Sequence, residues 1–213
     1  VVACGRQYPE RLDDVAWEND RAAYRAYGPA LQEKGERAFG YDIWTKSVSE
    51  PVVEDRYDGD LNRGISYHVD HGNGMDCYAV GPTLGGGTAA LFPDSTIVYP
   101  YCYKDCEILD NGPLRFTAKL VYNPLVVKGD SNVIETRIIS LDKGSQLNKT
   151  VVSFDNLQEI TPVVTGIVLH KQNPTGYSFD ANAGYIAYAD STENAANNNG
   201  VIYIGAVFPA TVK

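Results

Sequence analysis

The feature that most constrains the fold is a series of short runs rich in β-branched and aromatic residues, separated by turn signals, from residue 95 onward. Such runs are typical of β-strands. The tetrapeptides "DNGP" and "DKGS" predict hairpin turns, because Asn-Gly and Lys-Gly tolerate the positive φ that a tight reversal needs. The strand candidates are "STIVYPYCYKDCEILDNGP", "LRFTAKLVYNPLVV", "SNVIETRIISLDKGS", "LNKTVVSFDN", "ITPVVTGIVLHK", "GYIAYAD" and "GVIYIGAVFP". Long helical runs of Leu, Ala, Lys and Glu are absent, so we predict an all-β protein, an antiparallel β-sandwich that forms a single domain over residues 1–213.

Two N-terminal segments are also expected to be strands with one polar face. The segment 15–29, "VAWENDRAAYRAYGP", sorts with period two into an apolar face and a polar face, the latter with Asn19, Arg21 and Arg25. The segment 40–48, "GYDIWTKSV", sorts in the same way and presents Asp42, Trp44 and Lys46 in a row. We predict that both polar faces point outward, and that residues 50–64 form an acidic loop.

The charge and hydropathy of the chain exclude two classes of partner. The formal net charge is −9, so the surface as a whole does not attract nucleic acid or anionic lipid. No apolar stretch of about 18 residues exists, so no membrane insertion is expected. No signal peptide opens the chain, so any export signal is expected to have been removed. The four cysteines lack the CxxC spacing of a zinc site and are expected to be free thiols: Cys4, Cys77, Cys102 and Cys106.

The stretch "YHVDHGNGMDCYAVG" holds two of the three histidines of the chain, at positions 68 and 71. His68, Asp70 and His71 fit three kinds of chemistry. They suit acid and base catalysis near neutral pH, a divalent metal site, or a turn capped by hydrogen bonds. Asp76 and Tyr78 add two polar groups on what we expect to be the following strand. The glycine run "GPTLGGG" that comes next lacks the Gly-Lys-Ser/Thr of a phosphate-binding loop.

The three polar segments together suggest a sugar site. Aromatic rings stack on pyranose C–H faces, and charged groups form hydrogen bonds with hydroxyls. Cations gather on these faces although the chain as a whole is acidic, which favours a carboxylated or sulfated sugar.

Several blocks resemble an uncharacterised-domain family of Bacteroidetes and related bacteria that is usually encoded in polysaccharide-utilisation loci. They are "PERLDDVAWENDRAAYRAYGPAL", "GYDIWTKS", "YHVDHGNGMDCYAVGPTLGGG", "NGPLRF" and "ISLDKGSQLNK", and they cover most of residues 6–150. The resemblance implies a galactose-mutarotase-like β-sandwich, a periplasmic or secreted location and a role in degrading acidic polysaccharides. A relative is thought to be a dehydratase that converts a terminal uronic acid into a 4,5-unsaturated sugar. The family continues beyond "GAVFPATVK", so this chain is expected to be short or divergent at its C terminus.

That resemblance suggests a role for each candidate residue. The substrate would be an acidic oligosaccharide, and His68 and His71 would be base and acid, with Tyr78 as an alternative acid. Neutralising the carboxylate would fall to Lys46, Arg21 or Arg25, and a ring would stack on Trp44. The remaining substrate-binding candidates are Asn19, Asp70, Asp76 and His170.

Four rival interpretations stay open. Asp70 and Asp76 would be the carboxylate pair of a glycoside hydrolase. A metal-dependent lyase would use His68, Asp70 and His71 as ligands, and a divalent metal is the only cofactor that we consider. A carbohydrate-binding module would need Trp44 and the arginines without the histidines, and a purely structural sandwich would bind no sugar.

Overall fold

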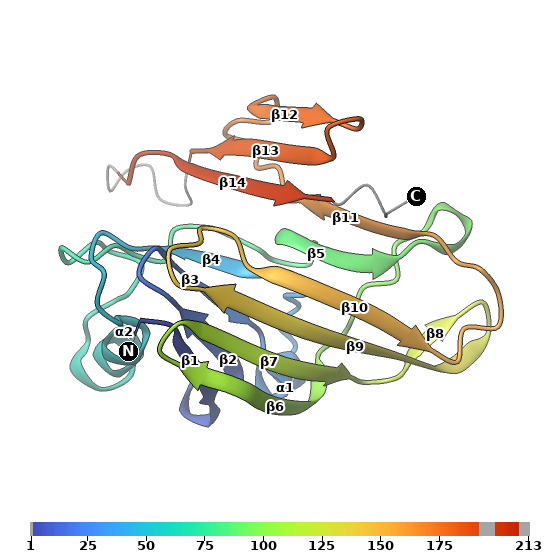
Figure 1. Cartoon of the computed structure of the whole chain (residues 1–213), viewed down its shortest axis with the longest axis horizontal. Helices are drawn as coiled ribbons and strands as arrows, with labels where there is room; N and C mark the ends of the chain where they lie inside the picture. Colours follow the sequence, from blue (N-terminus) through green and yellow to red (C-terminus); the bar gives the residue numbers. More distant parts are fainter. Residues whose placement is uncertain (1, 192–198, 209–213) are drawn as a thin grey trace.

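The computed structural model describes residues 2–191 and 199–208. Its first four strands form an antiparallel sheet in sequence order: β1 (Cys4–Tyr8), β2 (Asp14–Glu18), β3 (Ala22–Ala26) and β4 (Asp42–Thr45) (Figure 1). The prediction of one strand over residues 15–29 was wrong, because the chain reverses between β2 and β3. Asn19 causes the reversal, since its Oδ1 accepts hydrogen bonds from the backbone N–H groups of Arg21 and Ala22, at 2.8 and 3.0 Å.

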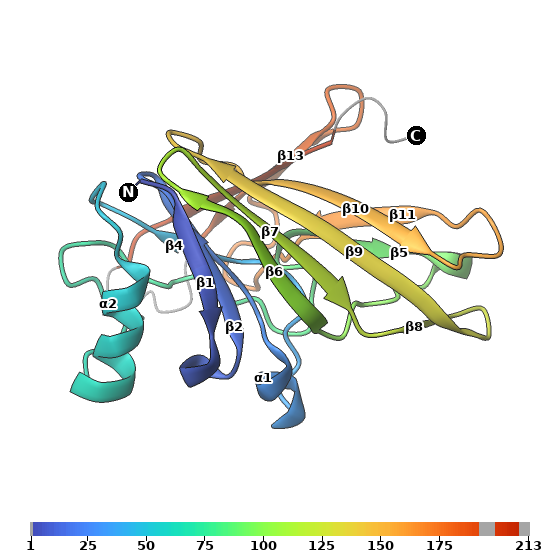
Figure 2. The same cartoon turned by 60° about the horizontal axis from the view of Figure 1, so that its bottom comes forward.

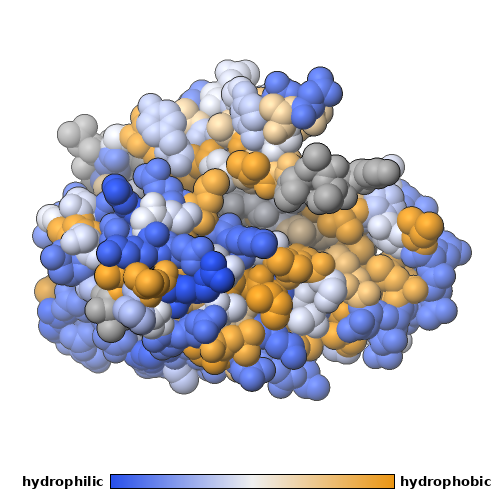
Figure 3. All heavy atoms as spheres, in the orientation of Figure 1, coloured by the Kyte–Doolittle hydropathy of each residue, from blue (hydrophilic) through white to orange (hydrophobic). Residues whose placement is uncertain are grey.

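The second sheet contains the strand candidates between residues 103 and 155 in the order β10-β9-β7-β6. Both predicted hairpins are confirmed, because β6 pairs with β7 and β9 pairs with β10, and Gly144 in the second turn has φ +80°. The strands are β6 (Tyr103–Gly112), β7 (Arg115–Tyr122), β9 (Asp130–Asp142) and β10 (Lys149–Asp155), with β8 (Leu125–Val127) paired to β9. Figure 3 has the orientation of Figure 1, in which these strands lie in front. Hydrophobic side chains gather toward the middle of this view. None of the predicted site residues belongs to this sheet.

The two sheets pack face to face and bury the main core between them. Trp17 lies at its centre, stacked against Tyr24 at 5.8 Å and against Phe116 of the opposite sheet at 6.0 Å between ring centroids. Gly5 lets the sheets approach, because a Cβ at this position would lie 2.7 Å from Cε2 of Phe116 in the opposite sheet. The predicted antiparallel β-sandwich is therefore confirmed.

Two smaller sheets complete the fold. The first pairs β5 (Gly86–Leu91) with β11 (Val163–Ile167), and the second contains β12 (Tyr177–Asp180), β13 (Tyr185–Asp190) and β14 (Ile202–Val207). In Figure 1 the second one lies at the top of the molecule, above β5 and β11. β5 begins at Gly86, within the glycine run, and this strand was not predicted from the sequence. The predicted strand through His170 ends earlier, at Ile167.

A third layer covers the other face of the N-terminal sheet. It consists of α2 (Val53–Asp58), the π-helical turn η2 (Gly59–Arg63) and residues 65–80. Figure 2 shows α2 on the side of β1 and β2 that faces away from β6 and β7. Val53 and Tyr57 lie four residues apart, on one face of α2, and pack against Tyr8 and Trp44. The predicted loop over residues 50–64 is thus largely helical, and the polar face of the N-terminal sheet is not outward.

The remaining short elements are α1 (Pro29–Glu33) and the single 3-10 turns η1 (Pro9–Arg11) and η3 (Pro93–Ser95). All four cysteines are free thiols, as predicted, and burial raises the pKa of the Cys77 thiol to about 12. Within residues 2–191 and 199–208, no helix has the length and apolar character needed to cross a bilayer.

Candidate functional site

The two neighbouring histidines lie in a tight loop, residues 66–74, which we call the histidine turn. Asp70 organises it, because its Oδ1 accepts hydrogen bonds from the backbone N–H groups of Gly72 and Gly74, at 2.8 and 3.0 Å. These bonds lower the pKa of Asp70. Both glycines have positive φ, near +95°, which glycine adopts without strain. The geometry therefore gives Asp70 a turn-forming role.

His71 and His68 have their tautomers fixed in opposite senses by carbonyl acceptors. The Nε2 of His71 lies 2.9 Å from the carbonyl oxygen of Ser66, so Nε2 carries the proton and Nδ1 keeps a lone pair. The Nδ1 of His68 lies 3.2 Å from the carbonyl oxygen of Asp76 and 3.7 Å from its Oδ2, so in neutral His68 the lone pair is on Nε2. The side chain of His68 is 51% exposed and rests against the ring of Tyr67.

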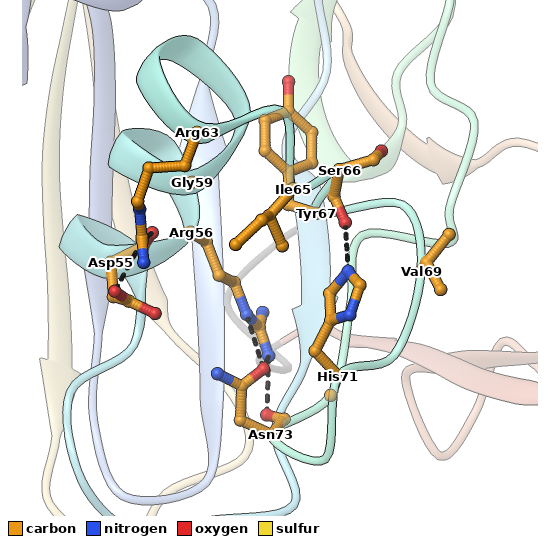
Figure 4. Close-up of a pocket in the computed structure, with 11 residues that line it drawn as sticks. Asp55, Arg56, Gly59, Arg63, Ile65, Ser66, Tyr67, Val69, His71 and Asn73 are labelled. Atoms are coloured by element: carbon orange, nitrogen blue, oxygen red, sulfur yellow. Dashed lines mark hydrogen bonds and ion pairs between the residues drawn. The ribbon is translucent and has the colours of Figure 1, made fainter.

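A cavity of about 220 Å³ lies between α2 and η2, which we call the helical layer, and the histidine turn (Figure 4). His71 and Tyr67 line it from the turn, and Arg56 and Arg63 line it from the helical layer. Figure 4 shows the His71 ring held below Ser66, opposite the side chain of Arg56. The other lining residues are Asp55, Gly59, Ile65, Ser66, Val69, Asn73 and Gly74.

A buried charge network lies behind His68. Arg25 is 4% exposed and forms ion pairs with Asp42 at 2.5 Å, with Asp76 at 2.9 Å and with Asp14 at 3.7 Å. Burial raises the pKa of Asp14 to about 6, against the opposing effect of Arg25. Arg25 is therefore committed to internal carboxylates, and the prediction that it contacts a substrate is not supported by its position. Asp76 holds Arg25 on one side and faces His68 on the other.

Other predicted contact residues are also internal. Trp44 is 1% exposed and donates its Nε1–H to Asp42, so no sugar ring can stack on it in this structure. Lys46 is equally buried, and its Nζ binds Oε2 of Glu18 and the carbonyl oxygen of Asn19, both at 2.6 Å. The physical reason is the third layer, which covers the face that alternation alone assigned to solvent.

Asn19 and Arg21 lie apart from the histidine turn. The amide of Asn19 is buried in the β2–β3 turn, where it also binds the carbonyl oxygens of Asp142 and Ser145. Arg21 is exposed in that same turn and does not share a strand face with Arg25. The expected single row of cations is therefore not formed.

Tyr78 and His170 form a separate buried contact. Tyr78 donates its hydroxyl proton to the carbonyl oxygen of Gly85, and its ring packs edge-on against His170 at 5.6 Å. The two ring nitrogens of His170 face Oδ1 of Asp190 and the carbonyl oxygen of Ala79, both at 2.8 Å. This arrangement ties the C-terminal sheet to the segment that follows the histidine turn, and it leaves neither side chain directed at the cavity.

The metal hypothesis also depends on geometry. Among the residues that the structure describes, no group of three or more His, Cys, Asp or Glu side chains is placed to hold a metal ion. Asp70 is turned toward backbone N–H groups and His71 toward Ser66, so His68, Asp70 and His71 do not converge. The predicted ligand trio is therefore not a preformed metal site.

The sequence analysis missed Arg56 and the cavity. Arg56 was part of the presumed acidic loop, and the Val53 and Tyr57 spacing was the one signal that could have shown a helix there. Its position beside the histidine turn depends on how that helix packs, which the spacing does not give.

Comparisons with known proteins give a family but no activity. A family described as "Domain of unknown function (DUF4861)" matches residues 2–213. "Uncharacterized protein P7" of Formosa agariphila, a Bacteroidetes bacterium, is 31% identical over 199 residues, which are 90% of this chain and 49% of that protein. The chain thus spans about half the length of this relative. No solved structure matches. The predicted resemblance to an uncharacterised-domain family is confirmed at that level.

Proposed function

The chain belongs to the DUF4861 family, and we propose that it is a carbohydrate-active lyase or dehydratase that acts on oligosaccharides containing uronic acid. The reaction eliminates across C4 and C5 of the uronate and gives an unsaturated sugar. The observation that carries the proposal is the histidine turn. It presents two imidazoles with opposite tautomers, one of them beside a cavity that also holds guanidinium groups.

Elimination needs one base and one acid. In the proposed reaction the Nδ1 lone pair of His71 takes the C5 proton, the C4–O bond breaks, and the C4=C5 double bond forms. The departing hydroxyl takes a proton from Nε2 of His68 and leaves as water. We assign the base to His71 because it lines the cavity, and the acid to His68 because its Nδ1 faces Asp76, which leaves the Nε2 proton of the imidazolium form for the leaving group.

The C5 proton becomes acidic only when the adjacent carboxylate is neutralised. Arg25 and Lys46 are held by internal acids, so Arg56, which lines the cavity, takes this role in the proposal. The proposed reaction is therefore the one expected from the sequence, but the cation that neutralises the carboxylate comes from the helical layer and not from the N-terminal sheet.

The glycoside hydrolase alternative is weaker, because its two carboxylates are occupied. Asp76 is 2% exposed and paired with Arg25, and Asp70 accepts two backbone hydrogen bonds. Asp76 is therefore not available to flank a glycosidic bond, and Asp70 already forms the turn through its Oδ1.

A galactose-mutarotase-like relationship, a periplasmic or secreted location and an origin in a polysaccharide-utilisation locus remain parts of the proposal. They agree with a β-sandwich that acts on acidic sugars.

The test is to mix the protein with uronic-acid oligosaccharides and follow the ultraviolet absorbance of the conjugated unsaturated carboxylate. We expect wild type to produce it, with or without chelator, and His68→Gln and His71→Gln to lose at least about 100-fold in rate. His170→Gln is the matched control, since this histidine lies outside the cavity, and it should keep the rate. Sugar binding without any absorbance rise would refute elimination and leave a binding module. A rate that both histidine variants retain would place the chemistry elsewhere.

A further inference from the structure

The helical layer contains a buried cation that has no carboxylate within ion-pair distance among the described residues. Arg56 is 5% exposed, yet it forms no ion pair with any carboxylate among residues 2–191 and 199–208. Its Nη2 donates to the carbonyl oxygens of Thr45 at 2.9 Å and Asn73 at 2.6 Å. Its Nη1 is buried and has no hydrogen-bond partner within that described part. An isolated buried charge with an unused donor is costly, so it calls for a partner.

The lack of a carboxylate partner distinguishes Arg56 from the other deeply buried arginines of this protein. Arg25 is surrounded by three carboxylates, and Arg137 is paired with Glu135. Burial lowers the pKa of Arg56, whereas the pKa of Arg137 is raised by Glu135 despite complete burial. Among these three, Arg56 alone lines the cavity.

The surroundings hold the guanidinium in place from both sides. Its carbon lies 5.7 Å from the centre of the Trp44 ring, which buries one face. A Cβ at Gly74 would lie 2.8 Å from Nη2 of Arg56, so glycine at this position leaves room for the side chain. The histidine turn and β4 thus form a preorganised cradle around Arg56.

We propose that the cavity is a binding site for one carboxylate group, held by the guanidinium of Arg56, on a ligand the size of a single sugar acid. The carboxylate part of this inference rests on Arg56 alone, and the sugar part rests on the proposed function.

The charge of the cavity selects a monoanion. Arg63, the second guanidinium, is already paired with two carboxylates, Asp55 at 2.6 Å and Asp58 at 2.8 Å, so of the two guanidiniums that line the cavity Arg56 is the one left to pair with a ligand. One carboxylate balances the charge of Arg56, whereas a sulfate or phosphate dianion would add an excess negative charge near Asp55. The volume of about 220 Å³ is below the roughly 300 to 1,000 Å³ of pockets for drug-sized ligands, which favours a single small unit.

The binding test uses calorimetric titration of the whole chain with sodium D-glucuronate, D-glucose and sodium sulfate. Glucuronate is expected to bind, and glucose and sulfate to bind at least about tenfold more weakly. Arg56→Met should weaken glucuronate binding by at least about tenfold, and Arg56→Lys should restore little, because a lysine cannot reproduce the fork. Arg115→Met, which removes an exposed arginine paired with Asp142, is the matched control and should bind as wild type does.

A second measurement covers the case in which Arg56→Met does not fold. In wild type, glucuronate should shift the nuclear magnetic resonance signals of the Arg56 guanidinium and of the backbone amides of Asn73 and Gly74. Absent shifts, or shifts confined to other regions, would overturn the inference. So would a folded Arg56→Met variant with unchanged affinity, or sulfate binding as tight as glucuronate binding.

The outcomes separate this inference from the proposed function. Glucuronate binding that depends on Arg56, without elimination from any oligosaccharide, would support the site and refute the enzyme. Elimination that is unaffected in Arg56→Met, in both KM and kcat, would refute the site and the role given to Arg56 in the reaction, while the elimination activity itself would stand.

Discussion

Replacing Lys46 by methionine should destabilise the whole fold, because Lys46 neutralises a buried acid. The side chains of Lys46 and Glu18 are 1% and 3% exposed, and their charged atoms lie 2.6 Å apart. Glu18 also accepts hydrogen bonds from the backbone N–H groups of Val52 and Val53, at the start of α2. Removing the ammonium leaves a buried carboxylate with backbone donors only, which costs about 3 to 5 kcal/mol.

The magnitude can be measured by urea or thermal unfolding followed by circular dichroism. For a chain of this size the loss corresponds to a fall in Tm of about 6 to 20 °C. The double variant Lys46→Met/Glu18→Gln should recover part of it, with a coupling energy of about 2 to 3 kcal/mol. Lys149→Met on β10, where the lysine is exposed, is the matched control and should stay within about 0.5 kcal/mol of wild type.

The result that would refute this reasoning is a Lys46→Met variant that loses less than about 1 kcal/mol of stability. Lys46 would then not hold Glu18 in solution. If the same variant had lost elimination, Lys46 would have the catalytic role expected from the sequence.

Three further predictions concern the core and the buried acids. The native state holds the proton of Asp14 up to about pH 6, whereas the unfolded chain releases it near pH 3.8. The unfolding free energy of wild type should therefore fall by up to about 3 kcal/mol between pH 4 and 6 relative to that of Asp14→Asn, and parallel pH curves for the two proteins would refute this. Gly5→Ala should cost about 1 to 3 kcal/mol in urea unfolding, because its methyl group would overlap Phe116 of the opposite sheet, and a neutral effect would show that the sheets separate easily. His170→Gln should increase hydrogen exchange in β13 by exposing the buried Asp190, and unchanged exchange would contradict the proposed tie.

The strands could be predicted because their signals are local. Alternation in β9 and β10 and the turn at Gly144 are properties of neighbouring residues, so both hairpins were recognised from the sequence. The β2–β3 reversal was missed although its cause is also local. Asn19 was assigned to a polar strand face, whereas its Oδ1 caps a turn two and three residues later.

The burial of the polar face could not be predicted in the same way. Alternation separates the two faces of a strand and does not say what covers either of them. Arg25 and Asp42 lie opposite each other in the β3–β4 register, so their charges compensate only after the strands pair. α2 then covers this face with Tyr57, and the apparent sugar platform at Trp44 becomes part of an aromatic core.

Only part of the candidate site could be predicted from the sequence. The histidines at 68 and 71 stand out because they are rare and adjacent, and the turn does bring both to the surface. Arg25, Arg56 and Arg137 look equivalent in the sequence, since each is an arginine among polar and apolar neighbours. What distinguishes Arg56 is a missing acid, and that is a property of three-dimensional packing. The proposed carboxylate site therefore depends on the packing around Arg56, which the sequence alone does not show.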